Sequence, residues 1–359
     1  MELICGDYNK KVKYMHKILI CGHFGGNEEF LDGQTIKTKN IYLALLDKYG
    51  EKEINKIDTY QWKKHPISFL KKCIDGSKDS KNIIILPAQN GVRVFIPLFL
   101  LINKLYKRKI FYIVVGGWLP EFLENRKGLL KKVKKLDKIF VETNNMKKKL
   151  EKIEVKNVEI LVNFKSITPL KEELVFNYSK PYKLCTFSRV MKEKGIEDAI
   201  QVVKNINEEF NETIYELDIY GQIDKSYKDT FTEVINNSPK YVQYKGCINS
   251  EKSVETLKNY YLLLFPTKFK TEGIPGTIID ALSAGVPIIA SRWDNADEII
   301  CDGKNGLIYE FNDLVDFYNK LKMILDYKKV YNMKYNCIED AKRFTTECAM
   351  EKIYTNLKE

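Results

Sequence analysis

The sequence of 359 residues contains no apolar run long enough to cross a membrane. A spanning helix needs about 18 or more consecutive apolar residues, and the longest apolar stretch, residues 94–102, is interrupted by Pro97. The first residues also lack the apolar core that follows the basic start of a secretion signal. We therefore expect a cytoplasmic protein.

Clusters with metal-ligand spacing are absent as well. The eight cysteines are scattered singly without a C-x-x-C pair, so neither a zinc site nor a disulfide framework is indicated. The sequence has no D-x-D element, and we expect neither a metal nor another cofactor. Cys21, Cys185 and Cys247 lie in or beside predicted strands, where cysteine is usually a small buried apolar residue.

Length and charge divide the chain into two halves. A chain of 359 residues is longer than one hydrophobic core usually serves, which favours two domains. Residues 1–170 hold 33 Lys and Arg against 18 Asp and Glu, a net charge of +15, whereas residues 171–359 hold 26 against 30, a net charge of −4. The basic half is suited to an anionic surface: phospholipid, a phosphorylated carrier or nucleic acid.

Apolar runs of strand length alternate with amphipathic segments of helical length, which predicts parallel α/β sheets. The boundary is expected at residues 163–181, which contain Pro169 and Pro181 and show no periodicity. This gives an N-terminal domain of residues 1–170, a C-terminal domain of residues 171–340, and a helix at 341–359 that packs back on the N-terminal domain. We expect strands at 17–21, 82–86, 110–115, 138–141, 158–161, 183–187, 215–220, 242–244, 261–265 and 287–290, and helices at 35–49, 93–106, 195–210 and 277–284.

The strongest functional signal is the loop at residues 271–276, which follows an apolar run and precedes a predicted helix. Gly273 and Gly276 let the backbone approach a ligand, and the helix start offers unpaired N–H groups that suit a diphosphate. Glu272 can accept hydrogen bonds from sugar hydroxyls. A structural alternative exists for Asp280, because Thr277 and Asp280 have the T-x-x-D spacing of a capping box.

The second signal is a pair of cations after the first predicted strand of the C-terminal half. Arg189 and Lys194 lie on a loop that enters a helix. Two cations at the carboxyl end of a strand can neutralise a diphosphate leaving group as its charge develops. The alternative is a surface ion-pair role for both side chains.

These motifs resemble those of the retaining glycosyltransferases of family 4, which have the GT-B fold. Ser188-Arg189 to Lys194-Gly195 is similar to the element whose Arg and Lys bind the donor diphosphate. Glu272 and Asp280 resemble an E-x7-E motif, in which the first acid meets the donor sugar and the second meets the ribose; Asp280 is one methylene shorter than the usual Glu. The same resemblance assigns backbone contacts with sugar and phosphates to Gly273, Ile274, Pro275, Gly276 and Thr277.

Three other segments share the resemblance. Gly246, Cys247 and Ile248 correspond to the segment that holds the nucleotide base, and Gly33 and Gln34 to a glycine loop that approaches the donor phosphates from across the cleft. Residues 297–307 resemble a structural stretch. Outside the matched motifs, His23 follows the first strand and is a candidate to face the cleft, with a buried or surface histidine as the alternative. The Gly116-Gly117-Trp118 segment ends another strand and is a candidate acceptor-side loop.

The resemblance implies a fold of two Rossmann-like doubly wound domains that face a central cleft. It also implies transfer with retention from a UDP- or GDP-sugar to a saccharide or lipid-linked saccharide, in capsule, exopolysaccharide or lipopolysaccharide synthesis. Because no residue stands out as a nucleophile, we expect attack on the same face from which the nucleoside diphosphate departs.

Two basic helical segments suggest peripheral docking on the inner face of the plasma membrane. Residues 127–138 combine an apolar stripe with five lysines between Lys131 and Lys138, and residues 93–109 offer Phe95, Leu98 and Phe99 beside a basic end. The alternative for the first segment is an ordinary surface helix whose stripe faces the core.

Three other functions are open at this stage. A nucleic-acid-binding protein explains the basic half, but the sequence carries no recognisable nucleic-acid motif, and we expect no nucleic acid as a partner. A GT-B subunit that has lost catalysis, or a sugar-nucleotide epimerase, would keep the same fold.

Overall fold

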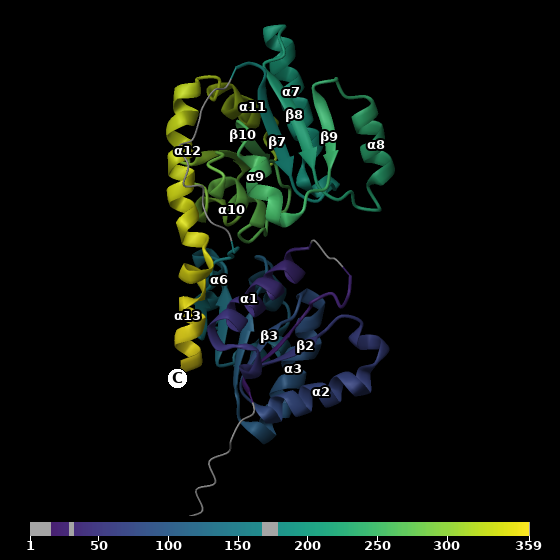
Figure 1. The fold of residues 1–359 in the computed structure, drawn as a ribbon, viewed down its shortest axis with the longest axis vertical. Helices are drawn as coiled ribbons and strands as arrows, with labels where there is room; N and C mark the ends of the chain where they lie inside the picture. The colour runs from purple at the N-terminus through teal and green to yellow at the C-terminus, as the bar shows by residue number, and fades with distance from the viewer. Residues whose placement is uncertain (1–15, 29–31, 167–178, 359) are drawn as a thin grey trace, which may run out of the picture. The chain divides into compact units, whose positions relative to one another are not determined.

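The computed structural model describes residues 16–28, 32–166 and 179–358 (Figure 1). The chain separates into two compact units. The first consists of Met1–Ile113 with Lys127–Ile139, and the second of Val114–Arg126 with Phe140–Glu359. The predicted boundary at 163–181 falls largely on residues 167–178, which lie outside the described part, and the domain limits stay a prediction.

The first sheet has six strands in the order β2-β1-β3-β4-β5-β6. From Ile18 to Gly22 the residues of β1 are buried on both faces, as expected for a parallel strand covered by helices on each side. The strand order reverses between β1 and β3, because β2 lies on one side of β1 and the later strands follow on the other. The strands are β1 (His16–Gly22), β2 (Ile54–Asp58), β3 (Ser80–Leu86), β4 (Lys109–Ile113), β5 (Lys138–Val141) and β6 (Val158–Ile160).

Two helices of this half, α1 and α3, end at the predicted residues and begin two and four residues before the predicted starts. Asp32 caps the first of them, since its carboxylate accepts a hydrogen bond from Thr35 N at 3.1 Å. The helices are α1 (Gly33–Tyr49), α2 (Pro66–Asp79), α3 (Gln89–Tyr106), α4 (Leu119–Glu124), α5 (Lys127–Val133) and α6 (Asn144–Lys152), with 3₁₀ turns at Glu51–Glu53 and Trp62–Lys64.

The second sheet has six strands in the order β12-β11-β10-β7-β8-β9, and all of its paired strands are parallel. The strand order reverses between β10 and β7, the two central strands. The strands are β7 (Tyr182–Phe187), β8 (Tyr215–Tyr220), β9 (Val242–Gly246), β10 (Leu262–Phe265), β11 (Ile288–Ser291) and β12 (Gly306–Tyr309).

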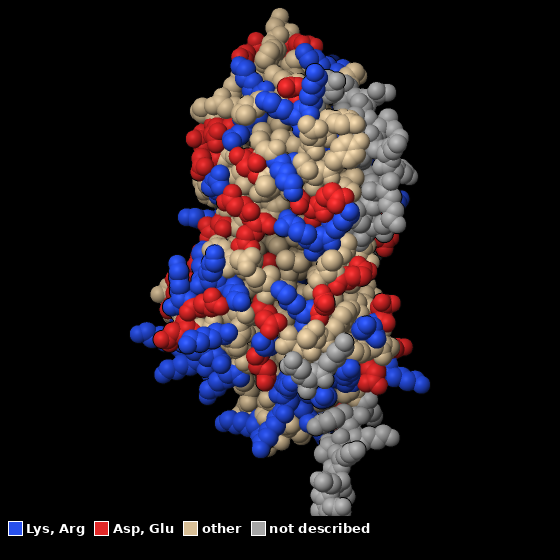
Figure 2. Space-filling view, turned by 90° about the vertical axis from the view of Figure 1, so that its left-hand side faces the viewer, with Lys and Arg blue, Asp and Glu red and all other residues tan. Residues whose placement is uncertain are grey.

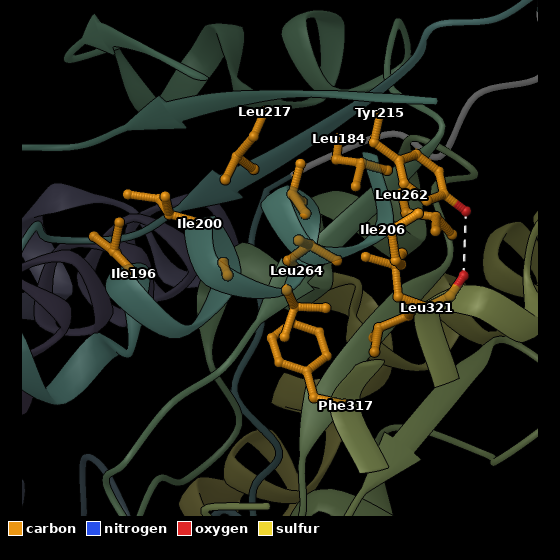
Figure 3. Close-up of a cluster of buried hydrophobic side chains, with 14 of the residues drawn as sticks. Leu184, Ile196, Ile200, Ile206, Tyr215, Leu217, Leu262, Leu264, Phe317 and Leu321 are labelled. Atoms are coloured by element: carbon orange, nitrogen blue, oxygen red, sulfur yellow. Dashed lines mark hydrogen bonds between the residues drawn. The ribbon is translucent and has the colours of Figure 1, made fainter. Parts of the chain in front are cut away.

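Helices pack against the second sheet through a continuous apolar core (Figure 3). Leu184, Leu262 and Leu264 of the central strands lie against α7 and α11, and Tyr215 Oη donates to the carbonyl oxygen of Leu321 at 3.2 Å. The helices are α7 (Ile196–Phe210), α8 (Lys228–Asn236), α9 (Ser253–Leu257), α10 (Gly276–Ser283), α11 (Leu314–Met323), α12 (Tyr327–Ala341) and α13 (Thr346–Lys358), with 3₁₀ turns at Lys192–Lys194, Ser250–Lys252, Ala296–Glu298 and Lys342–Phe344.

The predicted GT-B class, two doubly wound parallel α/β sheets, is confirmed. In α13, Asn356 donates to the carboxylate of Glu159 in β6 at 3.0 Å, within the second unit. Cys21 and Cys185 are buried as predicted, whereas the burial expected for Cys247 is wrong, because it lies exposed just after β9. No described helix is long and apolar enough to cross a membrane.

The predictions for the basic helices need correction. Phe95 and Phe99, which were expected to face lipid, are buried in the core. The exposed apolar side chains of α3 are instead Val94, Leu101 and Leu105. In the segment 127–138 the helix ends at Val133, and Val133 and Leu136 are buried, which favours the ordinary surface helix.

Candidate functional site

The carboxyl ends of β7 and β10 lie at the point where the strand order of the second sheet reverses. In open parallel sheets, ligands bind in the crevice at such a reversal. The segment with Arg189 and Lys194 follows β7, and the loop with Glu272 follows β10. The topology therefore brings the two strongest sequence signals to adjacent strand ends.

Lys194 and Glu272 are in direct contact. Lys194 Nζ forms an ion pair with Glu272 Oε1, and the side chains are only 16% and 18% exposed. Thr267 Oγ1 donates to the same carboxylate oxygen at 3.2 Å. A cation and an acid from segments 78 residues apart are thus held together in a partly buried position, where water screens charge less than at the surface.

Close packing between the backbones of two segments brings Lys194 and Glu272 together. Gly195 has φ +66°, and a Cβ there would lie 1.9 Å from the carbonyl oxygen of Pro266, so no other residue fits. Lys268 N donates to the carbonyl oxygen of Glu193 at 2.7 Å, and Lys268 Nζ pairs with Asp198 at 2.9 Å. These bonds hold the segment after β7 against the segment after β10.

Arg189 remains at the surface. Its side chain is 54% exposed, and its nearest carboxylate is Asp224, at 4.0 Å. Hydrogen bonds from Ser226, and then the nearby Arg189 charge, lower the pKa of Asp224. An exposed pair at this distance contributes little to stability, so the Arg189 guanidinium is held only weakly in this position.

The loop at residues 271–276 is fixed by a buried carboxylate from the segment after β5. Glu142 is 2% exposed; its Oε2 accepts from Ile274 N at 2.9 Å and its Oε1 from Gly116 N at 3.3 Å. A Cβ on Gly273 would lie 2.0 Å from Glu142 Oε2 and 3.0 Å from Gly116 Cα. Gly273 is therefore required for the close approach of the loop to Glu142.

Two asparagines hold the carbonyl groups of the same loop. Asn163 Nδ2 donates to Ile274 O at 2.8 Å, and Asn295 Nδ2 donates to Glu272 O at 2.5 Å. Gly117 N adds a bond to Thr271 O at 3.2 Å. The loop is consequently preorganised by side chains and a backbone N–H group that lie outside it.

The capping-box interpretation of Asp280 is wrong. Pro275 occupies the N-cap position of α10 and makes no side-chain cap, and Asp280 lies one turn inside the helix. Asp280 is 2% exposed and accepts a hydrogen bond from Lys165 Nζ at 2.5 Å. Burial raises the pKa of Asp280, and the Lys165 ammonium and the Ser253 hydroxyl oppose part of that rise.

The segment expected to hold a base lies at the end of β9. Gly246 O accepts a hydrogen bond from Gly221 N at 2.9 Å, which ties the ends of β8 and β9 together. Cys247 is exposed, and Ile248 packs against a further buried apolar cluster that includes Phe265 and Trp293. Since β9 and β8 follow β7 in the sheet, these residues lie on the same sheet edge as Arg189 and Lys194.

In the first unit, Gly33 and Gln34 begin α1. Gln34 Nε2 donates to Leu86 O, at the end of β3, at 2.7 Å. His23, which follows β1, places Nδ1 2.8 Å from Thr35 Oγ1. These residues lie at the carboxyl ends of β1 and β3, where the order of the first sheet reverses.

The sequence did not reveal the residues that support the loop. Glu142, Asn163 and Lys165 precede the second sheet, and no spacing pattern links them to the loop more than 100 residues later. Glu298 in the stretch interpreted as structural accepts bonds from Asn144 N and Asn145 N at the start of α6, both at 2.6 Å. Among the described residues, no group of three or more His, Cys, Asp or Glu could hold a metal ion.

A known protein family matches the part of the chain that contains the second sheet. Residues 170–344 match the family described as glycosyl transferases group 1. The matched residues contain Arg189, Lys194, the 271–276 loop and Asp280. The prediction of a glycosyltransferase domain is confirmed for this part of the chain.

Proteins of similar sequence also carry glycosyltransferase names. An uncharacterized glycosyltransferase of Methanocaldococcus jannaschii, MJ1069, is 24% identical over 199 residues, which cover 54% of this chain and 46% of the relative. The GtfA subunit of a UDP-N-acetylglucosamine–peptide N-acetylglucosaminyltransferase from Streptococcus pneumoniae is 31% identical over 132 residues, 36% of this chain and 24% of the relative. Each match spans less than two thirds of the relative's length.

Solved structures share the fold across nearly the whole chain. Sucrose-phosphate synthase from Thermosynechococcus elongatus matches with a TM-score of 0.73 and 13% identity, covering 96% of this chain and 99% of its own. Anabaena HepE in complex with UDP-glucose matches with a TM-score of 0.71 and 14% identity, covering 95% and 99%. At these identities the likeness concerns the fold alone.

Proposed function

We propose that the protein is a retaining glycosyltransferase of family 4. It moves a sugar from a UDP- or GDP-sugar to a saccharide or lipid-linked saccharide acceptor during the synthesis of a cell-surface polysaccharide. The contact between Lys194 and Glu272 at the reversal point of the second sheet carries the proposal. It pairs a group that suits a phosphate with a group that suits sugar hydroxyls.

The cations of the site suit the diphosphate of such a donor, and the acid Glu272 suits its sugar. The diphosphate binds Lys194, Arg189 and the N-terminus of α10, whose N-cap residue gives no side-chain bond. The donor sugar binds Glu272 and the fixed backbone of the 271–276 loop. Residues 246–248 are assigned to the base, and the family resemblance alone would assign Asp280 to the ribose. Lys194 and Glu272 neutralise each other in their ion pair.

The proposed reaction exchanges one bond at the anomeric carbon. The bond between this carbon and the leaving phosphate oxygen breaks, and the acceptor hydroxyl attacks from the same face. Because the new bond forms on the face from which the phosphate departs, the configuration is retained. The hydroxyl proton passes to the leaving phosphate. Arg189 and Lys194 stabilise the charge that develops on the diphosphate, the role we assign to them in place of a metal ion.

Two structural relatives support a uridine nucleotide. Anabaena HepE was solved with UDP-glucose, and the pneumococcal O-GlcNAc transferase GtfA, which matches with a TM-score of 0.63 and 18% identity, was solved with UDP and GlcNAc. We accordingly place UDP-sugars ahead of GDP-sugars among the donors to be tested.

An anionic membrane is the proposed location of the acceptor. Lys and Arg side chains are numerous on the face of the first unit that Figure 2 shows. In α3 the side chains of Val94, Leu101 and Leu105 are 38%, 62% and 78% exposed. They recur at intervals of seven and four residues and so share one helix face. Exposed apolar side chains among basic residues suit peripheral binding to anionic lipid.

The function is tested by incubating the purified protein with a panel of UDP- and GDP-sugars. We expect slow release of nucleoside diphosphate from one donor, and a free sugar whose first-formed anomer matches the donor by NMR. The opposite anomer would contradict retention. An epimerised nucleotide-sugar would identify an epimerase, and nucleotide binding without turnover of any donor would identify an inactive partner subunit.

A further inference from the structure

Lys165 occupies an unexpected place at the start of α10. Its backbone is held by a hydrogen bond from Lys165 N to Phe344 O at 3.2 Å, next to a bridge with Thr345. Its side chain lies over Gly276, the first residue of α10: a Cβ on Gly276 would be 3.0 Å from Lys165 Cε and 3.6 Å from Nζ. The ammonium therefore lies at the N-terminus of the helix.

This is an unfavourable place for a cation without a compensating anion. The N-terminus of a helix carries partial positive charge, and the first turn of α10 contains no acidic residue. Asp280, one turn further along the helix, compensates by accepting a hydrogen bond from Lys165 Nζ at 2.5 Å. Among the described residues, Asp280 is the only hydrogen-bond partner of that ammonium.

Exposure decides which member of this pair can meet a ligand. Asp280 is 2% exposed, whereas the side chain of Lys165 is 15% exposed. An ammonium has three N–H donors, and Asp280 uses one of them. A ligand at the start of α10 therefore meets the ammonium, while the carboxylate lies beneath it.

We propose that Lys165 binds the diphosphate of the nucleotide at the N-terminus of α10, and that Asp280 is a positioning residue that holds the ammonium there. The inference rests on the proposed function and adds a third cation to Arg189 and Lys194. An anion at this position pairs with both the lysine and the helix dipole, so it relieves the repulsion between them. The resemblance instead assigned a direct ribose contact to Asp280.

The test removes the pair as a unit. Removing Lys165 alone would leave a buried carboxylate without its partner, so the variant is Lys165→Met with Asp280→Asn. The matched control is Lys320→Met with Asp302→Asn, because Lys320 is similarly exposed at 21% and its Nζ lies 3.7 Å from Asp302. Thermal melting checks that both variants fold. Calorimetry then measures the binding of UDP, GDP, uridine and guanosine.

We expect the Lys165 and Asp280 variant to bind its nucleoside diphosphate about 10- to 100-fold more weakly than the wild type. The nucleoside, which lacks phosphates, should bind both proteins alike, and the control should bind as the wild type does. Unchanged diphosphate affinity in a folded variant would overturn the role of Lys165 and leave the proposed function standing. A wild type that binds neither UDP nor GDP would overturn the proposed function itself.

A measurement on the wild type covers the case in which the variant does not fold. Amine labelling, read by mass spectrometry, is compared with and without saturating UDP or GDP. The proposal predicts that the nucleotide protects Lys165 and leaves Lys320 unchanged. Equal labelling of Lys165 in both conditions would overturn it.

Discussion

At the scale of single residues, the site depends on contacts between short loops and side chains distant in sequence. Glycine is needed where backbone meets backbone, as at Gly195 against Pro266, and where backbone meets a buried carboxylate, as at Gly273 against Glu142. These contacts set the positions of Lys194 and Glu272, which flank the proposed ligand. Small changes in loop packing should therefore affect function more than stability.

Gly273→Ala tests this relation between packing and function. The added Cβ would lie 2.0 Å from Glu142 Oε2, so Glu142 must leave Ile274 N or the loop must shift. We expect donor turnover to fall by about 100-fold or more, because misplacement of reacting groups by about 1 Å has effects of that size. Loss of the buried hydrogen bond should cost about 1–3 kcal/mol of unfolding free energy.

The control for this prediction is Gly128→Ala in α5. A Cβ at Gly128 meets nothing within 4 Å, and alanine favours helix. This variant should keep wild-type turnover and wild-type or slightly higher stability. Undiminished turnover in Gly273→Ala would show that the loop tolerates displacement and that its preorganisation by Glu142 is unimportant.

The sequence predicted the contact between Lys194 and Glu272 but could not predict what supports it. Both residues lie in recognisable motifs directly after apolar runs, and parallel strands bring such positions to one sheet edge. Glu142 and Lys165 have ordinary local surroundings, and only the tertiary fold brings them to the 271–276 loop. Asp280 was misinterpreted because T-x-x-D spacing is a local pattern, whereas its partner Lys165 lies 115 residues away.

At the scale of elements, buried strands were the most predictable features. The strands β5 and β8 have the predicted limits. In β5 an apolar run follows Lys138, and in β8 apolar and polar residues alternate from Tyr215 to Ile219. The short strands β2 and β12 were missed. The sequence of β2, INKID, mixes polar and apolar residues, and β12 has only four residues after a turn. The long helix α2 was also missed, and its sequence contains a glycine near its end.

The exposed face of α3 gives a prediction at this scale. The variant Val94→Ser, Leu101→Ser, Leu105→Ser should lose binding to phosphatidylglycerol vesicles, because these side chains supply the apolar area for insertion. The wild type should sediment with these vesicles and not with phosphatidylcholine vesicles. Melting temperature should change little, since the three side chains are exposed.

Val315→Ser on α11 is the control for the vesicle measurement. Val315 is 70% exposed and lies in the second unit, away from the basic half of the sequence. The Val315→Ser variant should bind vesicles as the wild type does. Equal sedimentation of the wild type and the triple variant would show that α3 is not a docking surface.

At the scale of the whole molecule, each half of the sequence has its own sheet, its own core and its own charge. The two doubly wound patterns could be predicted because apolar and amphipathic segments alternate along the chain. The division of the chain into its two compact units was harder to predict from the sequence. Val114–Arg126 and the residues from Phe140 onward belong with the second sheet. In that range Glu142 and Asn163 hold the 271–276 loop, and Lys165 pairs with Asp280 of α10. The proposed donor site therefore draws on segments that precede the second sheet.

The most direct test of the account is the donor turnover of Arg189→Ala and of Glu272→Ala, measured beside the wild type and the exposed control Arg343→Ala with the donor that the panel identifies. If these residues meet the diphosphate and the sugar, each of the first two variants should lose about 100-fold or more in turnover while keeping a normal melting curve. Arg343→Ala should be unaffected. Wild-type rates in Arg189→Ala and Glu272→Ala would contradict the site.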